Sequence, residues 1–193
     1  MPVDLIGRGQ QRLEGHLKGQ CLRGGEPGGD LAGVGGDLLE RAGAGRRGTI
    51  TGLYTVLVEG DDFNEPVADA ARSILDGHIV LTRKLAAQKH FPAIDVLDSV
   101  SRVRDQVIAP EHLNAANVLL RLEAAWRANE DLIAVGAYKA GGDKLADAAI
   151  QLRDETLNFL RQRAEDGTSY EETRVRLAAI AQRTNAMLGG RPG

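Results

Sequence analysis

The spacing of apolar residues changes along the chain, and these changes divide it into segments. From Thr49 to Glu59 ("TITGLYTVLVE") the residues are mostly β-branched, aromatic or aliphatic and form an almost continuous apolar run. Such a run is typical of a strand that is covered on both faces, as in a parallel sheet. The sequence therefore predicts a strand over residues 49–59, which the polar stretch "GDDFNEP" ends.

Two helices and two more strands are predicted between residues 64 and 102. Asn64 can cap a helix whose first turn tolerates Pro66, and "VADAARSILDG" runs from Val67 to a helix-stopping glycine. The next segments predict a strand ("HIVLTR"), a short helix ("KLAAQK") and a third strand or strand-like segment ("AIDVLDSVSR"). This alternation of strands and helices indicates an α/β sheet.

After Pro110 the apolar residues recur at helical spacing. They form three groups: Leu113, Val118, Leu119, Leu122 and Trp126; Leu145, Ala149, Leu152, Leu157 and Leu160; and Val175, Leu177, Ile180, Ala181 and Leu188. Asp143 can cap the second group, and Ser169 with Glu172 forms a capping box before the third. We therefore predict an all-α domain over residues 110–188, followed by a frayed tail over 189–193.

Residues 1–36 contain many glycines, and their few apolar residues follow neither a helical nor a strand period. Glycine at this density costs more backbone entropy than so little burial can offset, so we expect this stretch to be largely disordered. Its segment "GEPGGDLAGVGG" resembles a phosphate-binding loop only in glycine content. A P-loop needs Gly-Lys-Ser/Thr at the start of a helix, whereas Asp37 and Leu38 follow here.

Composition excludes several classes of function. The net charge of −3 gives no electrostatic reason to expect nucleic acid or an anionic membrane as a partner. The single cysteine, Cys21, forbids an internal disulfide and suits a reducing compartment. No apolar run approaches the roughly 20 residues of a transmembrane helix, and no secretory signal is apparent. The four histidines (His16, His78, His90, His112) lack ligand spacing, so no metal site is predicted.

Arg102 closes the third predicted strand, where a guanidinium is costly unless an anion meets it. The residues alone suggest an ordinary ion pair at the end of the strand, with Asp95 or Asp98 as the partner of Arg102. Spacing by itself favours this interpretation.

Four separated segments carry a family resemblance. "LLERAG" (38–43), "TVLVEGDDFNEPVADAARSILDGHIVL" (55–81), "FPAIDVLDSVSR" (91–102) and "DLIAVGAYKAGGD" (131–143) resemble, in order and spacing, the C-terminal part of the flagellar and type III secretion export ATPases. These are relatives of the rotary F-type ATPase α and β subunits. Residues 1–36 do not resemble the family.

The resemblance implies an α/β plus α fold. Residues 37–109 would be the distal part of a RecA-like P-loop NTPase core, and residues 110–188 the C-terminal all-α helical domain. The family assembles as a homohexamer with nucleotide between neighbouring subunits.

The resemblance also gives roles to individual residues. Arg102 matches the arginine finger that reaches the phosphates bound by the next subunit, a role suited to a planar and permanently charged fork. Phe91 matches the aromatic residue, usually tyrosine, that stacks on adenine. The alternative for Phe91 is a core aromatic beside a proline turn.

Two loops match segments that face the central stalk in rotary ATPases. Asp61, Asp62, Asn64 and Glu65 match the first of these loops. They also suit an exposed turn before a helix N-terminus, and both interpretations can hold together. Asp143 and Lys144 lie at the tip of the helix–turn–helix of the C-terminal domain, where the family usually has serine and proline around the aspartate.

Three elements of ATP hydrolysis are not found in this sequence: the Gly-Lys-Ser/Thr loop, the catalytic glutamate and the magnesium-binding aspartate of the Walker B strand. ATP and Mg²⁺ are thus the cofactors implied for the full-length family, and we expect neither to bind tightly to this chain alone. The chain would supply the adenine wall and the arginine finger of a site whose phosphate cradle lies elsewhere. We expect it not to hydrolyse ATP by itself.

Two hypotheses follow. In the first, the chain is a truncated or misread export ATPase that belongs in the cytoplasm, peripheral to the export apparatus at the inner membrane. In the second, it is a non-catalytic interaction module that binds a central stalk protein or export chaperone–substrate complexes.

Overall fold

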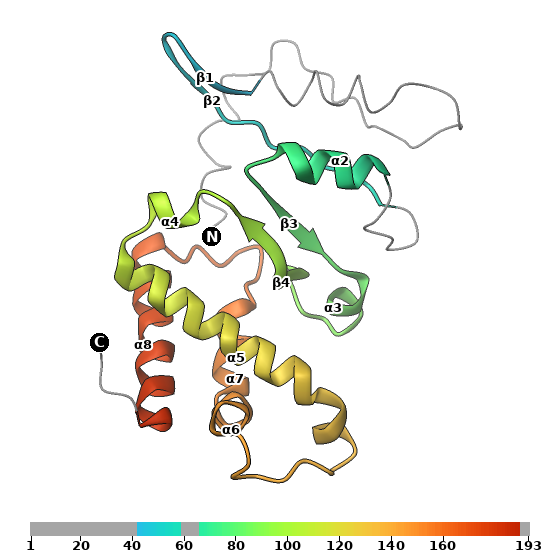
Figure 1. Ribbon diagram of the computed structural model, residues 1–193, viewed down its shortest axis with the longest axis vertical. Helices are drawn as coiled ribbons and strands as arrows, with labels where there is room; N and C mark the ends of the chain where they lie inside the picture. The colour runs from blue at the N-terminus through green and yellow to red at the C-terminus, as the bar shows by residue number, and fades with distance from the viewer. Residues whose placement is uncertain (1–41, 59–65, 190–193) are drawn as a thin grey trace. The chain divides into compact units, whose positions relative to one another are not determined.

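The computed structural model describes residues 42–58 and 66–189 (Figure 1). The predictions for the glycine-rich stretch 1–36, for the cap at Asn64 and for the tail after residue 189 lie outside these residues. Contacts between residues divide the described chain into two compact units, with the division between His78 and Ile79. Among the described helices, none has both the length and the apolar character needed to cross a membrane.

The described part of the first unit begins with a short antiparallel hairpin that the sequence did not reveal. Its strands are β1 (Gly43–Gly45) and β2 (Gly48–Ile50), with Gly43 opposite Ile50 and Gly45 opposite Gly48. Gly48 follows the turn with φ of +103°, in the left-handed region that glycine adopts without steric cost. The turn exposes Arg46 and Arg47 to solvent.

The strand predicted over residues 49–59 is wrong for most of its length. Only Thr49 and Ile50 lie in a strand, and residues 51–58 have no regular secondary structure. Leu53 and Leu57 are 80% and 66% exposed. An extended apolar run becomes a strand only where a neighbouring strand takes up its backbone hydrogen bonds. In the part of the chain that the structure describes, no strand pairs with residues 51–58.

The helix predicted after the polar break is confirmed as α2 (Pro66–Ile74). Pro66 occupies its first turn, where the missing N–H costs nothing because those N–H groups have no partner in the helix. Ala68 and Ala71 are buried, while Asp69 and Arg72 form an ion pair (3.4 Å) along the helix. The helix ends three residues before Gly77, which begins the next strand.

The second unit opens with the predicted strand–helix–strand segment. Strand β3 (Gly77–Leu81) pairs with β4 (Ile94–Ser101), and the short helix α3 (Arg83–Ala87) lies between them. Figure 1 shows the two strands running in opposite directions, and the backbone N–H of Thr82 donates to the carbonyl of Ala93 (3.0 Å). The Thr82 hydroxyl also caps α3 by accepting from the Leu85 N–H. One turn of helix, α4 (Arg104–Val107), follows β4.

The remaining helices form the predicted all-α domain, which we call the helical domain. They are α5 (Pro110–Ala134), α6 (Lys144–Gln151), α7 (Arg153–Leu160) and α8 (Tyr170–Leu188). Leucine, isoleucine and alanine side chains form its core: Ala115, Leu119, Leu122, Ala148, Ala149, Leu152, Leu177, Ile180 and Ala181. Four of these are alanines, and such small side chains let packed helices approach closely.

The ends of these helices follow the sequence signals closely. The Asp143 carboxylate accepts from the backbone N–H groups of Leu145 (2.8 Å) and Ala146 (3.3 Å), and the Ser169 hydroxyl accepts from that of Glu172 (3.2 Å). The caps at Asp143 and Ser169 are therefore confirmed, the latter by the bond to the Ser169 hydroxyl. The apolar run after Asp143 is divided into α6 and α7 at Leu152, which is buried at the junction.

Replacement of the cap of α8 should destabilise the helical domain. Ser169→Ala leaves the Glu172 N–H without its side-chain acceptor, and we expect a loss of about 1 kcal/mol in the free energy of unfolding. Urea denaturation followed by circular dichroism measures it. Ser169→Asp, which keeps an acceptor at the same place, should retain most of the stability. Equal losses in both variants would show that the cap is not the stabilising contact.

Candidate functional site

The two residues that the resemblance assigns to nucleotide lie at opposite ends of β4. Phe91 precedes the strand and is 52% exposed, while Arg102 follows Ser101 directly and is also exposed. A strand of eight residues is about 26 Å long, so the structure does not bring the two side chains together.

The residues that precede β4 are held by the segment that follows α7. The backbone N–H of Gln162 donates to the Phe91 carbonyl (2.9 Å), which fixes the main chain while the ring stays half exposed. His90, directly before it, is buried, and its own N–H donates to the Leu85 carbonyl (3.0 Å). The ring of Phe91 is therefore carried on a backbone with fixed hydrogen bonds on both sides.

Burial, together with the positive charges of Arg161 and Arg153, lowers the pKa of His90 below its ordinary value of 6.5. The imidazole is therefore neutral at neutral pH.

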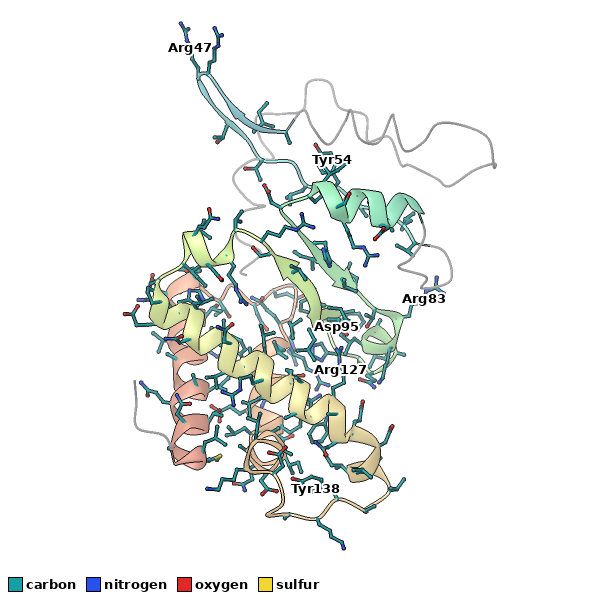
Figure 2. The ribbon with its side chains drawn as sticks, viewed as in Figure 1. Arg47, Tyr54, Arg83, Asp95, Arg127 and Tyr138 are labelled. Atoms are coloured by element: carbon teal, nitrogen blue, oxygen red, sulfur yellow. The ribbon has the colours of Figure 1, made fainter. Side chains whose placement is uncertain are left out.

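Asp95 and Asp98, the partners considered for Arg102, are bound by a residue that the sequence did not reveal. Arg127 on α5 donates through Nη2 to both carboxylate oxygens of Asp95 (2.6 Å each) and through Nη1 to Asp98 (3.3 Å). Figure 2 shows Asp95 and Arg127 side by side between β4 and α5. No local signal could have found this contact, because 32 residues separate the two partners. The role of Arg102 itself stays a prediction.

The Asp95–Arg127 contact stays charged over a wide pH range. Burial alone would raise the pKa of Asp95, but the hydrogen bonds from Arg127 and from the backbone N–H groups of Asp98 and Leu97 hold that pKa below its usual value. The two carboxylates in turn raise the pKa of Arg127. The pair is therefore ionised at physiological pH.

The loop that carries Asp143 and Lys144 is closed by a side chain from α6. The Tyr138 hydroxyl donates to Asp147 Oδ1 and the Gly141 N–H donates to Asp147 Oδ2, both at 2.9 Å. Gly141 has φ of +92°, which a side chain would strain. Asp143 and Lys144 are exposed at the end of this closed loop. The sequence singled out these two residues but missed Tyr138 and Asp147, whose spacing matches no standard motif.

Desolvation and the Asp147 carboxylate, which accepts the phenolic hydrogen bond, raise the pKa of Tyr138 above its ordinary value of 10.0. The position of Tyr138 beyond the end of α5 is visible in Figure 2.

The other predicted stalk-facing residues, Asp61, Asp62, Asn64 and Glu65, lie outside the described part of the chain. Within that part, no group of three or more His, Cys, Asp or Glu side chains could hold a metal ion. An open cleft of about 450 Å³ lies between α7 and α8. It is lined by Glu155, Asn158, Phe159, Arg176, Ala179, Ile180 and Arg183, and none of these is a predicted site residue.

Removal of the Asp147 charge should be visible in the titration of Tyr138. In Asp147→Asn an amide oxygen remains as an acceptor but the negative charge is gone, so we expect the pKa of Tyr138 to fall toward 10.0. Ultraviolet titration of the tyrosinate band measures this, and Tyr138→Phe identifies the contribution of Tyr138 among the three tyrosines. An unchanged midpoint in Asp147→Asn would contradict the contact.

The neutral state of His90 should make stability depend on pH below its ordinary pKa of 6.5. Because the pKa of His90 is lower in the folded chain, the unfolded chain takes up its proton first as the pH falls. The stability that His90 contributes is therefore complete above 6.5 and is lost below it. His90→Gln should reduce the difference in unfolding free energy between pH 7 and pH 5, measured by urea denaturation. An unchanged difference would count against a buried neutral imidazole.

Two protein families match successive parts of the chain. Residues 27–101 match the ATP synthase alpha/beta family, nucleotide-binding domain, and residues 108–179 match the T3SS EscN ATPase C-terminal domain. The first match begins ten residues before the boundary predicted at residue 37.

Curated relatives agree with these matches. The chain is 54% identical over 136 residues to the type 3 secretion system ATPase of Sinorhizobium fredii, covering 70% of this chain and 30% of that protein. It is 48% identical over 143 residues to the flagellum-specific ATP synthase of Bacillus subtilis, covering 74% and 33%. The chain thus spans about a third of the length of these relatives.

Solved structures show the same relationship. The assembled ATPase EscN of the enteropathogenic E. coli type III secretion system superposes with a TM-score of 0.74 at 47% identity, covering 78% of this chain and 36% of EscN. EscN in complex with its central stalk EscO gives a TM-score of 0.68 at 47% identity, covering 75% and 34%. The chain belongs to the family of type III secretion and flagellar export ATPases, and it matches parts of both the nucleotide-binding domain and the C-terminal domain.

Proposed function

We propose that this chain acts as the C-terminal portion of an ATPase that energises flagellar or type III protein export in a homohexamer. The observation that carries the proposal is the place of Arg102, exposed directly after a strand whose carboxylates are bound by Arg127 of α5. In a family of ATPases, an exposed and permanently charged group at the end of such a strand suits a phosphate bound by the next subunit.

The chemistry of the two nucleotide-facing residues is complementary. Arg102 offers a planar fork of N–H donors that matches the charge developing on a transferred phosphoryl group. Phe91 offers an exposed ring face, and stacking on adenine needs nothing more. Because they lie at opposite ends of β4, we assign Phe91 to the nucleotide of its own subunit and Arg102 to that of the neighbour.

The remaining parts of an ATP site would come from elsewhere in the assembly. The sequence has no Gly-Lys-Ser/Thr loop, and the described residues offer no carboxylate cluster for Mg²⁺. ATP and Mg²⁺ would therefore bind where those groups are supplied, and no metal-dependent step is assigned to residues of this chain. Alone, the chain should neither bind ATP tightly nor hydrolyse it.

The partners proposed here follow from the relatives. EscN has been solved as an assembled ATPase and in complex with its central stalk EscO. By analogy, we propose that Asp143 and Lys144, together with Asp61, Asp62, Asn64 and Glu65, face a central stalk protein. Export chaperone–substrate complexes are further proposed partners, on the cytoplasmic face of the inner membrane. The division into a core part (37–109) and the helical domain (110–188) belongs to the same proposal.

A second candidate function is a non-catalytic interaction module. It is favoured by the core of the helical domain, where Leu122 and Ile180 are 1% and 2% exposed, and by the loop that Asp147 closes. A module of this kind would bind a stalk protein or export complexes without any dependence on nucleotide.

A chimera decides between the two functions. Residues 37–188 would replace the matching segment of the Sinorhizobium fredii relative, which carries the rest of the enzyme. Arg102→Ala in this chimera should lower kcat for ATP by about 10³-fold or more, the usual effect of losing an arginine finger. Arg121→Ala, at an exposed position on α5, serves as the control and should leave kcat nearly unchanged. Full activity in Arg102→Ala would favour the interaction module.

A further inference from the structure

The segment between Phe91 and Arg104 makes contacts with the helical domain along its whole length. Gln162 holds the Phe91 carbonyl, Arg127 holds the carboxylates of β4, and Asn117 accepts from the Arg104 guanidinium (3.1 Å). Residues 79–189 likewise lie within one compact unit. Strand β4, which ends directly before Arg102, is therefore attached to the helices as well as to its partner strand.

Asp95 organises β4 from within. Its Oδ1 accepts from the backbone N–H groups of Leu97 (3.0 Å) and Asp98 (3.2 Å), a local turn of the kind that aspartate side chains form with residues two and three positions ahead. The Ser99 hydroxyl donates to the Asp95 carbonyl and accepts from the Val80 N–H on β3. This turn allows Asp95 and Asp98, three positions apart on a strand, to contact the same guanidinium.

Arg127 on α5 binds the same aspartates from outside the strand. Both of its Nη atoms are used, with two contacts of 2.6 Å to Asp95, whose side chain is only 11% exposed. Glu130, one turn further along α5, binds Lys84 of α3 (3.3 Å). The same face of α5 therefore holds both the strand and the helix that precedes it.

We propose that Arg127 is a positioning residue for Arg102. By binding Asp95 and Asp98, Arg127 fixes the end of β4, and the end of β4 fixes the point from which the Arg102 side chain extends. This inference rests on the proposed function of Arg102. Arg127 itself does not touch nucleotide, and it acts through the strand. A lysine could supply the charge but not the fork that binds both carboxylates, so the residue type matters as well as the charge.

Amide hydrogen exchange on the full chain tests the structural half of the proposal. Arg127→Met keeps the length and apolar stem of the side chain but removes its donors. We expect the Leu97 and Asp98 amides to lose protection, while the Ile180 amide in the core of α8 keeps it. Arg121→Met, at an exposed position on the same helix, is the matched control and should leave all three unchanged. Unchanged exchange at Leu97 and Asp98 in Arg127→Met would overturn the proposal.

The chimera with the Sinorhizobium fredii relative tests the functional half. Arg127→Met should lower kcat by about 100-fold, the order of loss that follows a displacement of about 1 Å in a catalytic group. KM for ATP should stay close to that of the parent chimera, Arg127→Lys should restore only part of kcat, and Arg121→Met should have no effect.

The outcomes separate this inference from the proposed function. If Arg102→Ala abolishes hydrolysis but Arg127→Met leaves kcat unchanged, the inference is wrong and the proposed function stands. If Arg102→Ala is harmless, the proposed function fails and the positioning role fails with it. A rise in KM with unchanged kcat in Arg127→Met would also overturn the inference, because it would indicate a role in ATP binding.

Discussion

The contact between Arg127 and the carboxylates of β4 joins two kinds of structure that otherwise have little in common. On one side, α5 packs its leucines and alanines against α6 and α8, where shape and apolar burial decide the arrangement. On the other side, it meets a strand through charge-assisted hydrogen bonds with defined directions. A single helix thus holds an apolar core and a charged strand at once, and the position of each depends on the register of α5.

Local signals in the sequence were sufficient for most of the helical domain. The caps at Asp143 and Ser169 and the apolar spacing of α5 each depend on residues within one or two turns of each other. Contacts over long distances in the chain could not be predicted in this way. The binding of Asp95 by Arg127 and the exposure of Leu53 depend on which distant segments come together, and propensity says nothing about that.

The candidate site likewise has parts that local sequence signals predict and parts that depend on contacts between distant segments. The positions of Phe91 and Arg102 at the two ends of one strand followed from the sequence, because the strand itself was predictable. What the sequence missed are the groups that support them: the Gln162 N–H, the Arg127 fork and the buried neutral His90. Gln162 and Arg127 belong to the helical domain, whereas His90 and the residues that these groups support belong to the segment that matches a nucleotide-binding domain.

The hydrogen bonds that Asp147 accepts from Tyr138 and Gly141 limit how the loop between α5 and α6 can change in evolution. Tyr138 and Gly141 are satisfied by a carboxylate that lies beyond the loop, on the first turn of the next helix. An insertion or deletion in the loop would leave that carboxylate without its donors, even if the new loop were well formed. We therefore expect residues 136–147 to be inherited as a single unit. Homologous proteins should tolerate exchange of the whole segment better than exchange of the loop alone.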